Sequence, residues 1–313
     1  MSGEIRGPLH GVPLSIKSSL AAAGLPWEAG SRLRAGRLAA RDAVLVSRLR
    51  SAGAIILGVT NTPELLMAWE TDNRLYGRTN NPWDLSRTAG GSSGGEAAAI
   101  ASGCSAGGVG SDGGGSIRVP AHFCGICGLK PTPGRIPATG HYPPSLGPFA
   151  LLGVVGPMAR TVADLRLLFE VMQGPDIGDP SAAPVPLRWP GFLAMGEDAR
   201  RSANHKGVLE VGRRPRIAFF EDDGRTPVTA ETRSGVKTAA SLLREAGFEV
   251  EALRPEGLEN AREVWWKFFG VVGGMLLGPL TREHEHELSP ILKQFQSWVA
   301  AETPLTAHTL LDC

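Results

Sequence analysis

Two serines in glycine-rich loops and one lysine at the end of a strand-like stretch have the residue types that acyl transfer needs. Ser92 and Ser116 lie in the loops, and Lys17 ends the alternating apolar stretch GVPLSIK. A serine hydroxyl is a weak nucleophile until a base removes its proton, and a neutral lysine can be that base. If the three side chains meet, they can form a Ser–Ser–Lys proton relay.

The glycine surplus of the chain is concentrated around these loops. The chain has 41 glycines in 313 residues, about 13% against a usual level near 7%. Eleven of the 26 residues from 90 to 115 are glycine. Their spacing is aperiodic and other residue types are interleaved, which excludes a collagen-like or low-complexity segment. A backbone of this kind must bend tightly or approach another group closely.

Two nucleotide-binding patterns are alternatives for this segment. Gly108, Gly110 and Gly113 match GxGxxG, which binds a dinucleotide when an acidic residue follows about twenty positions later. After Asp112 the next acidic residue is Asp164, so the ribose ligand is missing. A phosphate loop would need GxxxxGK[ST], and the segment contains neither that pattern nor a lysine.

A nucleophile elbow centred on Ser93 is a further alternative. Residues 91–95 match GxSxG, and His122, His141 or His205 could be nominated as the partner base. An elbow follows an apolar strand, whereas the preceding DLSRTAG is polar. This alternative predicts Ser93, rather than Ser116, as the nucleophile.

Two short elements must bring both serine loops to one edge of a sheet. A helix over residues 95–103 and a returning strand over residues 107–110 separate Ser92 from Ser116. Nine helical residues advance about 13 Å, and four or five strand residues return about 15 Å. The two lengths nearly cancel, so both serines can reach the edge at which Lys17 ends its strand.

The other N-terminal elements alternate between strand and helix. Alternation over residues 12–17 puts Lys17 on the face opposite the apolar residues. We expect Asp42 to cap a helix that stops at Gly53, and residues 54–59 to form a buried strand. A helix is also expected over residues 116–123.

The second half of the chain continues this alternation. Thr161 and Asp164 form a capping-box pattern before an amphipathic helix. Residues 174–207 hold five prolines and little periodicity, which indicates a surface excursion. A strand–helix–strand unit over residues 217–252 follows, and helices dominate from residue 258 onward. The alternation predicts an α/β fold with a mixed or parallel sheet.

Charge and composition exclude several classes of protein. Thirty-two basic residues balance thirty-one acidic ones, so nothing in the net charge favours a nucleic acid partner. The apolar run at residues 264–277 is shorter than the roughly twenty residues of a membrane span and contains Lys267, so we expect no span. Four cysteines and no apolar N-terminal stretch favour a reducing cytoplasm over a disulfide framework.

The motifs together resemble the amidase signature family. GVPLSIK at residues 11–17 resembles the lysine strand of the family, and GGSSGGEAAAIASG at residues 90–103 resembles its first serine loop. GSDGGGSIRVPAHFCGICGLKPT at residues 110–132 resembles its nucleophile loop. Weaker similarity continues through residues 156–169 and 216–224. The resemblance implies the amidase-signature fold, a mixed central sheet covered by helices.

The resemblance also implies the domain layout. We expect residues 1–313 to form a single domain with the catalytic motifs within residues 11–135. Family members carry a helical segment ahead of the lysine strand and further strands and helices beyond the equivalent of Cys313. The resemblance therefore implies that N- and C-terminal parts of the family fold are lacking.

The resemblance assigns a role to each relay residue. It implies Ser116 as the nucleophile, Ser92 as the bridging serine and Lys17 as the base, with a cis peptide bond between Gly91 and Ser92. As a base, Lys17 must be neutral, so its pKa must fall by roughly three units from about 10.4. Burial without a carboxylate partner produces such a shift, and the sequence around the motifs is poor in acids.

Stabilisation of the tetrahedral oxyanion is expected from the backbone of the nucleophile loop. The N–H groups of Gly113, Gly114, Gly115 and Ser116 are the candidate donors, because residues without a Cβ allow close approach. The family commonly has a larger residue at the position of Gly113. Glycine there predicts a more loosely held oxyanion loop.

Three polar residues beside the serines are expected to support the loops. The resemblance implies that Asp112 and Arg118, which carry opposite charges, brace the nucleophile loop and that Ser93 supplies a hydrogen bond. Ordinary capping of the loops is an equally open interpretation of all three residues.

Other conspicuous residues are expected to have structural roles. Cys124 and Cys127 have redox-motif spacing, but the resemblance makes them packing residues, and buried thiols are the more common outcome. His122 alone is insufficient for a zinc site. His284 and His286 diverge on a helix, which favours a solvated face.

The predicted function is hydrolysis of a linear carboxylic amide, a small molecule, to an acid and an amine or ammonia without cofactor or metal. The alternative within the family is the glutamine-hydrolysing amidotransferase A subunit. TPGRIPATGHYP, from residue 132 to 143, departs from the usual continuation in that protein and is closer to fatty-acid-amide-hydrolase-like and bacterial amidases. An inactive or fragmentary family member and a homodimer stay open.

Overall fold

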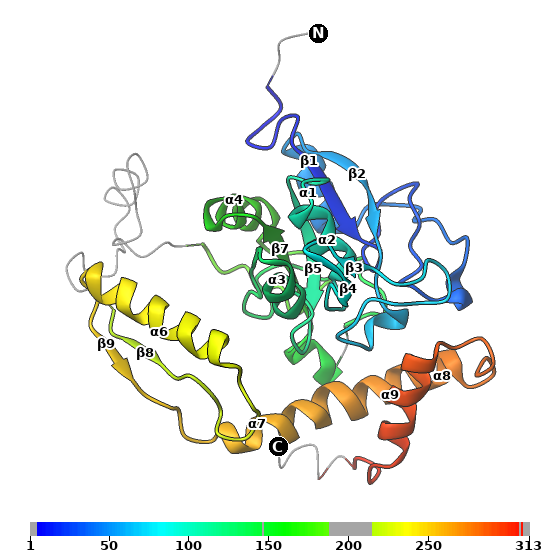
Figure 1. The fold of residues 1–313 in the computed structure, drawn as a ribbon. Helices are drawn as coiled ribbons and strands as arrows, with labels where there is room; N and C mark the ends of the chain where they lie inside the picture. The colour runs from blue at the N-terminus through cyan, green and yellow to red at the C-terminus, as the bar shows by residue number, and fades with distance from the viewer. Residues whose placement is uncertain (1–4, 146, 188–214, 307, 309–313) are drawn as a thin grey trace. The chain divides into compact units, whose positions relative to one another are not determined.

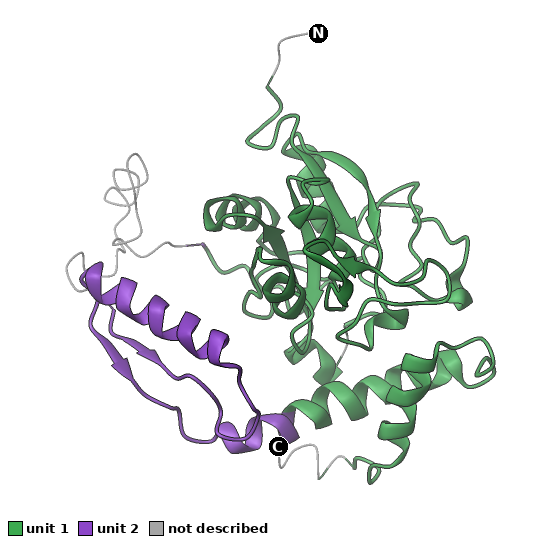
Figure 2. Ribbon diagram, in the orientation of Figure 1, with its two compact units in different colours: residues 1–186, 265–313 green, residues 187–264 purple. Residues whose placement is uncertain are grey.

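The computed structural model describes residues 5–145, 147–187, 215–306 and 308 (Figure 1). The chain divides into two compact units, residues 1–186 with 265–313 and residues 187–264 (Figure 2). The predicted relay residues and the glycine-rich loops all lie in the first unit.

A five-stranded mixed sheet forms the centre of the first unit. Strand β1 lies between β2 and β5 and is parallel to both, while β7 lies between β5 and β6 and is antiparallel to both. The strands are β1 Pro13–Lys17, β2 Ile55–Thr60, β5 Gly107–Asp112, β6 Cys127–Gly128 and β7 Val154–Ala159. The prediction of an α/β fold with a mixed sheet is therefore confirmed.

Helices cover both faces of this sheet. A Cβ built on Gly107 would meet Leu168 of α4, whereas one built on Gly108 would meet Glu96 of α2. Because neighbouring residues of a strand point to opposite faces, α2 and α4 lie on opposite sides of β5. The four helices of this region are α1 Val44–Ser51, α2 Gly94–Ala101, α3 Arg118–Cys124 and α4 Val162–Met172.

Burial on both faces explains the environment of Lys17. Central parallel strands are covered on both sides, and in β1 the side chains of Leu14 and Ile16 are buried together with that of Lys17 on the other face. The strand pairs Lys17 with Thr60 of β2 and Ile16 with Val109 of β5. A sequence that places lysine at the end of such a strand puts its amine inside the protein.

Two local predictions are wrong at the first helix and the following strand. Ala43, not Asp42, is the N-cap residue of α1, and no side chain caps it. Asp42 instead accepts a hydrogen bond from Ala23 N at 2.7 Å and pairs with Arg50 at 3.0 Å. Strand β2 is half-buried, because it lies at the edge of the sheet and not in its middle.

Other predicted elements are confirmed. Thr161 caps α4 by accepting a hydrogen bond from Asp164 N, as the capping-box pattern predicts. Helix α3 begins at Arg118, two residues after the expected start. Residues 174–187 form neither helix nor strand, and the rest of the predicted excursion, 188–207, lies outside the described residues.

The remaining elements of the first unit follow the sheet or connect its strands. The helical part after the second unit comprises the π-helical segment η5 Trp266–Val271, α8 Val272–Thr281 and α9 Pro290–Ala300. Short connecting elements are η1 Arg32–Arg34, η2 Glu64–Leu66, β3 Asn80–Asn81, β4 Asp84–Thr88 and η3 Gly147–Leu151. Helix α7 Leu258–Trp265 precedes η5 and, except for Trp265, belongs to the second unit.

One described helix has the length and composition of a membrane span. It covers Leu258–Thr281, 24 residues, and a third of its most apolar window is buried in the protein. Core helices of soluble proteins satisfy the same criterion, so this is weak evidence for a span. The helix is longer than the fourteen-residue apolar run because six residues precede that run in the helix and four follow it.

The second unit contains the predicted strand–helix–strand motif. Strands β8 Ile217–Phe219 and β9 Val250–Ala252 are parallel, and α6 Ala230–Glu245 connects them. Thr229 caps the helix by accepting a hydrogen bond from Thr232 N. The prediction for residues 217–252 is confirmed to within two residues at each boundary.

Candidate active site

Lys17 reaches the first serine loop through the interior of the protein. Its Nζ lies 2.7 Å from the Oγ of Ser92 and 3.0 Å from the Oγ of Ser111. The carbonyl oxygen of Ser111 lies 3.4 Å away. The Lys17 side chain has no exposed surface. The predicted contact between lysine and bridging serine is thus present, and Ser111 is an additional partner.

Burial makes Lys17 an unusually weak base for a lysine. Desolvation lowers its pKa from 10.5 to about 7, although the carboxylates of Asp112 and Glu96 act in the opposite direction. A buried ammonium loses its hydration, and here that loss outweighs the attraction of both acids. The expected fall of roughly three units is present, but the expectation that no carboxylate lies near the lysine is wrong.

Glu96 is the nearby acid that sequence reasoning missed. Its carboxylate accepts hydrogen bonds from the hydroxyls of Ser15 and Thr60, the latter at 2.7 Å, and it is completely buried. Burial raises its pKa to about 7, while those hydrogen bonds and Lys17 lower it. A signal for it exists in the sequence, because Glu96 is the one acid within the first serine loop.

The first serine loop is fixed against the second. The Gly91–Ser92 peptide bond is cis, as the family resemblance implies. The N–H of Ser93 donates to the carbonyl of Ser116 at 3.1 Å. The Ser93 hydroxyl lies 3.4 Å from both the N and the O of Ser111. Ser93 is fully buried, so it connects the two loops to strand β5.

Asp112 holds the second serine loop in its turn. Its carboxylate accepts hydrogen bonds from the backbone N–H groups of Gly115 at 2.7 Å, Ile117 at 3.0 Å and Arg118 at 3.3 Å. The Arg118 guanidinium adds two more, at 3.0 and 2.9 Å. Burial acts to raise the pKa of Asp112, but these donors lower it below its ordinary value. The two residues therefore brace this loop.

The bracing alters the expected set of oxyanion donors. Because the N–H of Gly115 donates to Asp112, it is already engaged, which corrects the expectation for Gly115. Among the described residues, the N–H groups of Gly113, Gly114 and Ser116 have no hydrogen-bond acceptor. These three remain as candidate donors to an oxyanion.

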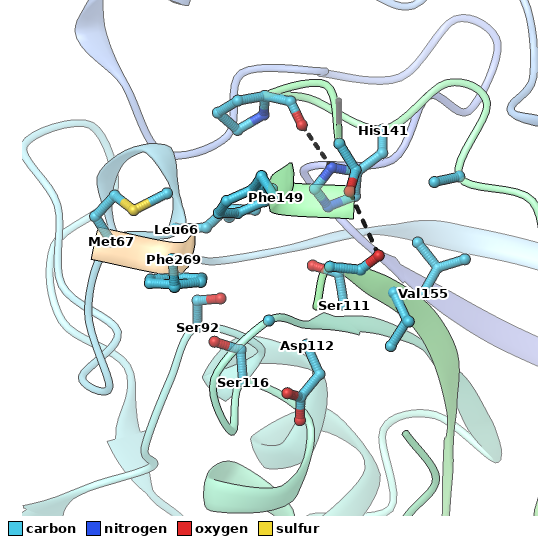
Figure 3. Close-up of a pocket in the computed structure, with 16 residues that line it drawn as sticks. Leu66, Met67, Ser92, Ser111, Asp112, Ser116, His141, Phe149, Val155 and Phe269 are labelled. Carbon is cyan, nitrogen blue, oxygen red and sulfur yellow. Dashed lines mark hydrogen bonds between the residues drawn. The ribbon is translucent and has the colours of Figure 1, made fainter. Parts of the chain in front are cut away.

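Ser92 and Ser116 open onto one pocket (Figure 3). The pocket has a volume of about 460 Å³, counting space open to solvent. Its lining combines apolar side chains with polar ones, among them Asp112 near the serines and His141. The apolar lining comes from Leu66, Met67, Phe149, Val154, Val155 and Phe269. A cavity of this composition fits an apolar group beside a reactive polar centre.

His141 is the histidine that lines this pocket. Its Nδ1 lies 2.7 Å from the carbonyl oxygen of Pro143, and its buried Nε2 has no hydrogen-bond partner among the described residues. Burial lowers its pKa to about 4. The other two nominated bases differ: His122 is exposed and contacts Phe123, and His205 lies outside the described residues.

The elbow alternative is not supported by these positions. Ser93 is fully buried and does not line the pocket, whereas Ser92 and Ser116 do. The structure thus joins Lys17 to Ser92 by a hydrogen bond and places Ser92 and Ser116 on one pocket, while Ser93 connects the two loops.

The described cysteines, and the described histidines other than His141, do not line the pocket. Cys124 is buried, its thiol is near the Ala89 carbonyl, and burial raises its pKa to about 11. Cys127 is a free thiol near the Arg160 carbonyl. His284 and Glu287 interact on an exposed turn. No group of three or more metal-ligating side chains occurs within the described ranges.

The sequence is similar to known amidases over most of its length. The Amidase family model matches residues 1–286. The chain is 50% identical over 264 residues to an acylamidase of Rhodococcus erythropolis, covering 84% of this chain and 52% of that protein. It is 42% identical over 246 residues to the glutamyl-tRNA(Gln) amidotransferase A subunit of Chloroflexus aggregans, covering 78% of this chain and 46% of that protein.

Solved structures share the fold over the whole chain. A bacterial aryl acylamidase of the amidase signature family superposes with a TM-score of 0.79 at 29% identity, covering 100% of this chain and 62% of that one. The chain spans about half the length of the relatives it matches in sequence. With its family match, its mixed sheet and its paired serine loops, the chain belongs to the amidase signature family.

Proposed function

We propose that the protein is an amidase that hydrolyses a linear carboxylic amide through an acyl-enzyme on Ser116. The observation that carries the proposal is the buried Lys17 amine, 2.7 Å from Ser92, behind a pocket that both serines line. A lysine whose pKa is about 7 is neutral in about half of the molecules at pH 7, and in more of them above it, so it can act as a base near neutral pH.

In the first half of the reaction, Ser116 attacks the amide carbonyl. Its proton passes to Ser92 as the Ser92 proton passes to neutral Lys17. The tetrahedral oxyanion accepts hydrogen bonds from the free N–H groups at residues 113, 114 and 116. Collapse of this intermediate needs a proton on the leaving nitrogen. Lys17 returns that proton through Ser92, and the amine or ammonia departs.

In the second half, a water molecule replaces the amine. The relay removes one proton from the water as the water attacks the acyl carbon, and the same donors stabilise the second oxyanion. As this intermediate collapses, Lys17 returns the proton through Ser92 to the Ser116 oxygen, the bond between that oxygen and the acyl carbon breaks, and the acid leaves. Each proton transfer is reversed within one cycle, so the scheme needs no cofactor or metal.

The pocket composition favours an apolar acyl group. Its lining consists largely of aliphatic and aromatic side chains, among them Met67, Phe149 and Phe269. Sequence identity is 50% to the acylamidase and 42% to the amidotransferase protein. Both observations favour simple amide hydrolysis over release of ammonia from glutamine. A cytoplasmic location and a homodimer stay predictions.

Labelling with a fluorophosphonate tests the proposal. The probe phosphonylates an activated serine, and peptide mass spectrometry identifies the residue. We expect the adduct on Ser116, loss of labelling in Ser116→Ala, and retention in a control at an exposed serine, Ser86→Ala. An adduct on Ser93 would favour the nucleophile elbow, and no adduct in the folded parent would indicate an inactive family member.

A further inference from the structure

The carbonyl groups of the oxyanion loop accept hydrogen bonds from two indoles. Nε1 of Trp265 donates to the carbonyl of Gly113 at 3.0 Å, and Nε1 of Trp69 donates to the carbonyl of Gly114 at 2.9 Å. Both carbonyls belong to the loop that carries Ser116. Glycine at position 113 predicts a loosely held loop, and the structure instead shows a loop held from outside.

A hydrogen bond to a carbonyl also sets the direction of the next N–H. The peptide bond is planar and trans, so the C=O of one residue and the N–H of the next point in opposite directions. The Trp265 indole therefore orients the N–H of Gly114, which has no acceptor among the described residues. The Trp69 indole orients the N–H of Gly115, which Asp112 already binds at 2.7 Å.

The indoles reach the loop because glycine leaves room for their rings. A Cβ on Gly114 would lie 2.6 Å from Trp265 Cζ2, and one on Gly113 would lie 2.7 Å from Phe269 Cε2. The rings of Trp265 and Phe269 stack with centroids 5.1 Å apart, and those of Trp69 and Trp265 stack at 5.5 Å. Aromatic rings thus occupy the space that larger loop side chains would take.

Resting on the proposed function, we propose that Trp265 is a positioning residue that aims the N–H of Gly114 at the oxyanion. Trp69 has a smaller effect, because Asp112 holds the opposite side of the same peptide plane. Neither tryptophan is among the residues that line the pocket. Loss of an oxyanion donor costs about 10²–10³-fold in rate. Loss of the bond that orients one donor should therefore cost less, about tenfold.

The test compares fluorophosphonate labelling rates of Ser116 in the parent and in Trp265→Phe, Trp69→Phe and Trp266→Phe. Trp266 is the matched control, since its indole donates to Glu302 at 2.7 Å and not to the loop. We expect Trp265→Phe to slow labelling about tenfold, Trp69→Phe less, and Trp266→Phe little. The pH dependence, which Lys17 governs, should not move in any variant.

A second readout separates positioning from general damage. A boronic acid forms a tetrahedral adduct with the serine and uses the oxyanion donors, whereas a product amine, which carries no such oxygen, does not. In Trp265→Phe the boronate should lose about as much affinity as the labelling rate loses, with amine affinity kept. If the variant fails to fold, benzothienylalanine at position 265 keeps the ring shape and removes only the N–H.

Each result supports or overturns the inference. A labelled parent with parental rates in Trp265→Phe, or equal losses in Trp265→Phe and Trp266→Phe, overturns it and leaves the proposed function intact. A folded parent that is not labelled on Ser116 overturns the proposed function and, with it, the role of Trp265.

Discussion

At the scale of single residues, the chemistry of the site depends on the pKa of the buried Lys17 amine, which desolvation and nearby charges set. Desolvation lowers the pKa of Lys17, while Asp112 and Glu96 raise it, and the result is about 7. Asp112 is neutralised by Arg118, which lies 2.9 Å away. Among the described residues, Glu96 accepts hydrogen bonds from the hydroxyls of Ser15 and Thr60, and Lys17 is the cation that lowers its pKa, so the Glu96 carboxylate acts directly on the lysine.

Replacing Glu96 should therefore shift the pH dependence of the relay. Its carboxylate raises the pKa of Lys17, so Glu96→Gln should lower that pKa and move the rising limb of Ser116 labelling to lower pH. Labelling rates measured against pH test this. Glu70→Gln, a change at an exposed acid paired with Arg78, is the control. An unmoved limb, or one moved to higher pH, would contradict the assigned role of Glu96.

At the residue level, the residues to which the sequence assigned a role in the relay all lie in the family motifs. Lys17, Ser92 and Ser116 could be named because they lie in dense family motifs. Ser111 lies in the same motif as Ser116 but received no predicted role, and His141 was considered only as the base of the nucleophile elbow. Each reaches the site through a contact between segments distant in sequence: β5 beside β1, and a loop beside residue 20. Such contacts depend on strand order, which alternation of residue types does not specify.

At the scale of elements, the nucleophile loop is held by a carboxylate inside and aromatic rings outside. Asp112 gathers three backbone N–H groups, and the indoles of Trp69 and Trp265 hold two carbonyls. Helix and strand positions around the loop followed from periodicity. The packing of the Trp265 indole on this loop could not be predicted from periodicity, since residue 265 lies far along the chain from residue 113.

The bracing predicts unequal effects at its two charged residues. Asp112→Ala leaves the N–H groups of Gly115, Ile117 and Arg118 without their acceptor in a buried loop. This change should lower the free energy of unfolding by about 3 kcal/mol. Arg118→Ala should cost at most about 1 kcal/mol, because the arginine side chain is 54% exposed. Urea unfolding measures both. Equal losses would show that the ion pair, and not the backbone bonds, carries the stabilisation.

At the scale of the whole molecule, the first unit holds both the sheet and the pocket. The family match runs through residue 286, across both units. That residues 1–313 form a single domain stays a prediction. Fold class was predictable because alternating elements and family motifs agree. The edge position of β2 could not be predicted, because a six-residue apolar run fits a central strand and an edge strand equally well.

Chelators and mild reductants should leave the activity of the molecule unchanged. The proposed relay moves protons between Lys17, Ser92 and Ser116 alone, and burial raises the pKa of the Cys124 thiol to about 11, which makes it inert. Ser116 labelling with and without EDTA, and with and without dithiothreitol, measures this. A large loss with reductant would indicate a structural disulfide, and a large loss with EDTA would indicate a required metal.

The central claim is that neutral Lys17 is the base. The most direct measurement is amide and ester hydrolysis against pH for the parent, Lys17→Ala and the control Lys130→Ala. We predict that the parent rate rises through about pH 7, and that Lys17→Ala loses this limb. Amide hydrolysis should fall by more than the roughly 10²–10⁴-fold typical of general base catalysis, because Lys17 also protonates the departing amine, and esters should fall less. An unchanged pH profile in Lys17→Ala would contradict this role of Lys17 and make His141, rather than the exposed His122, the next base to test.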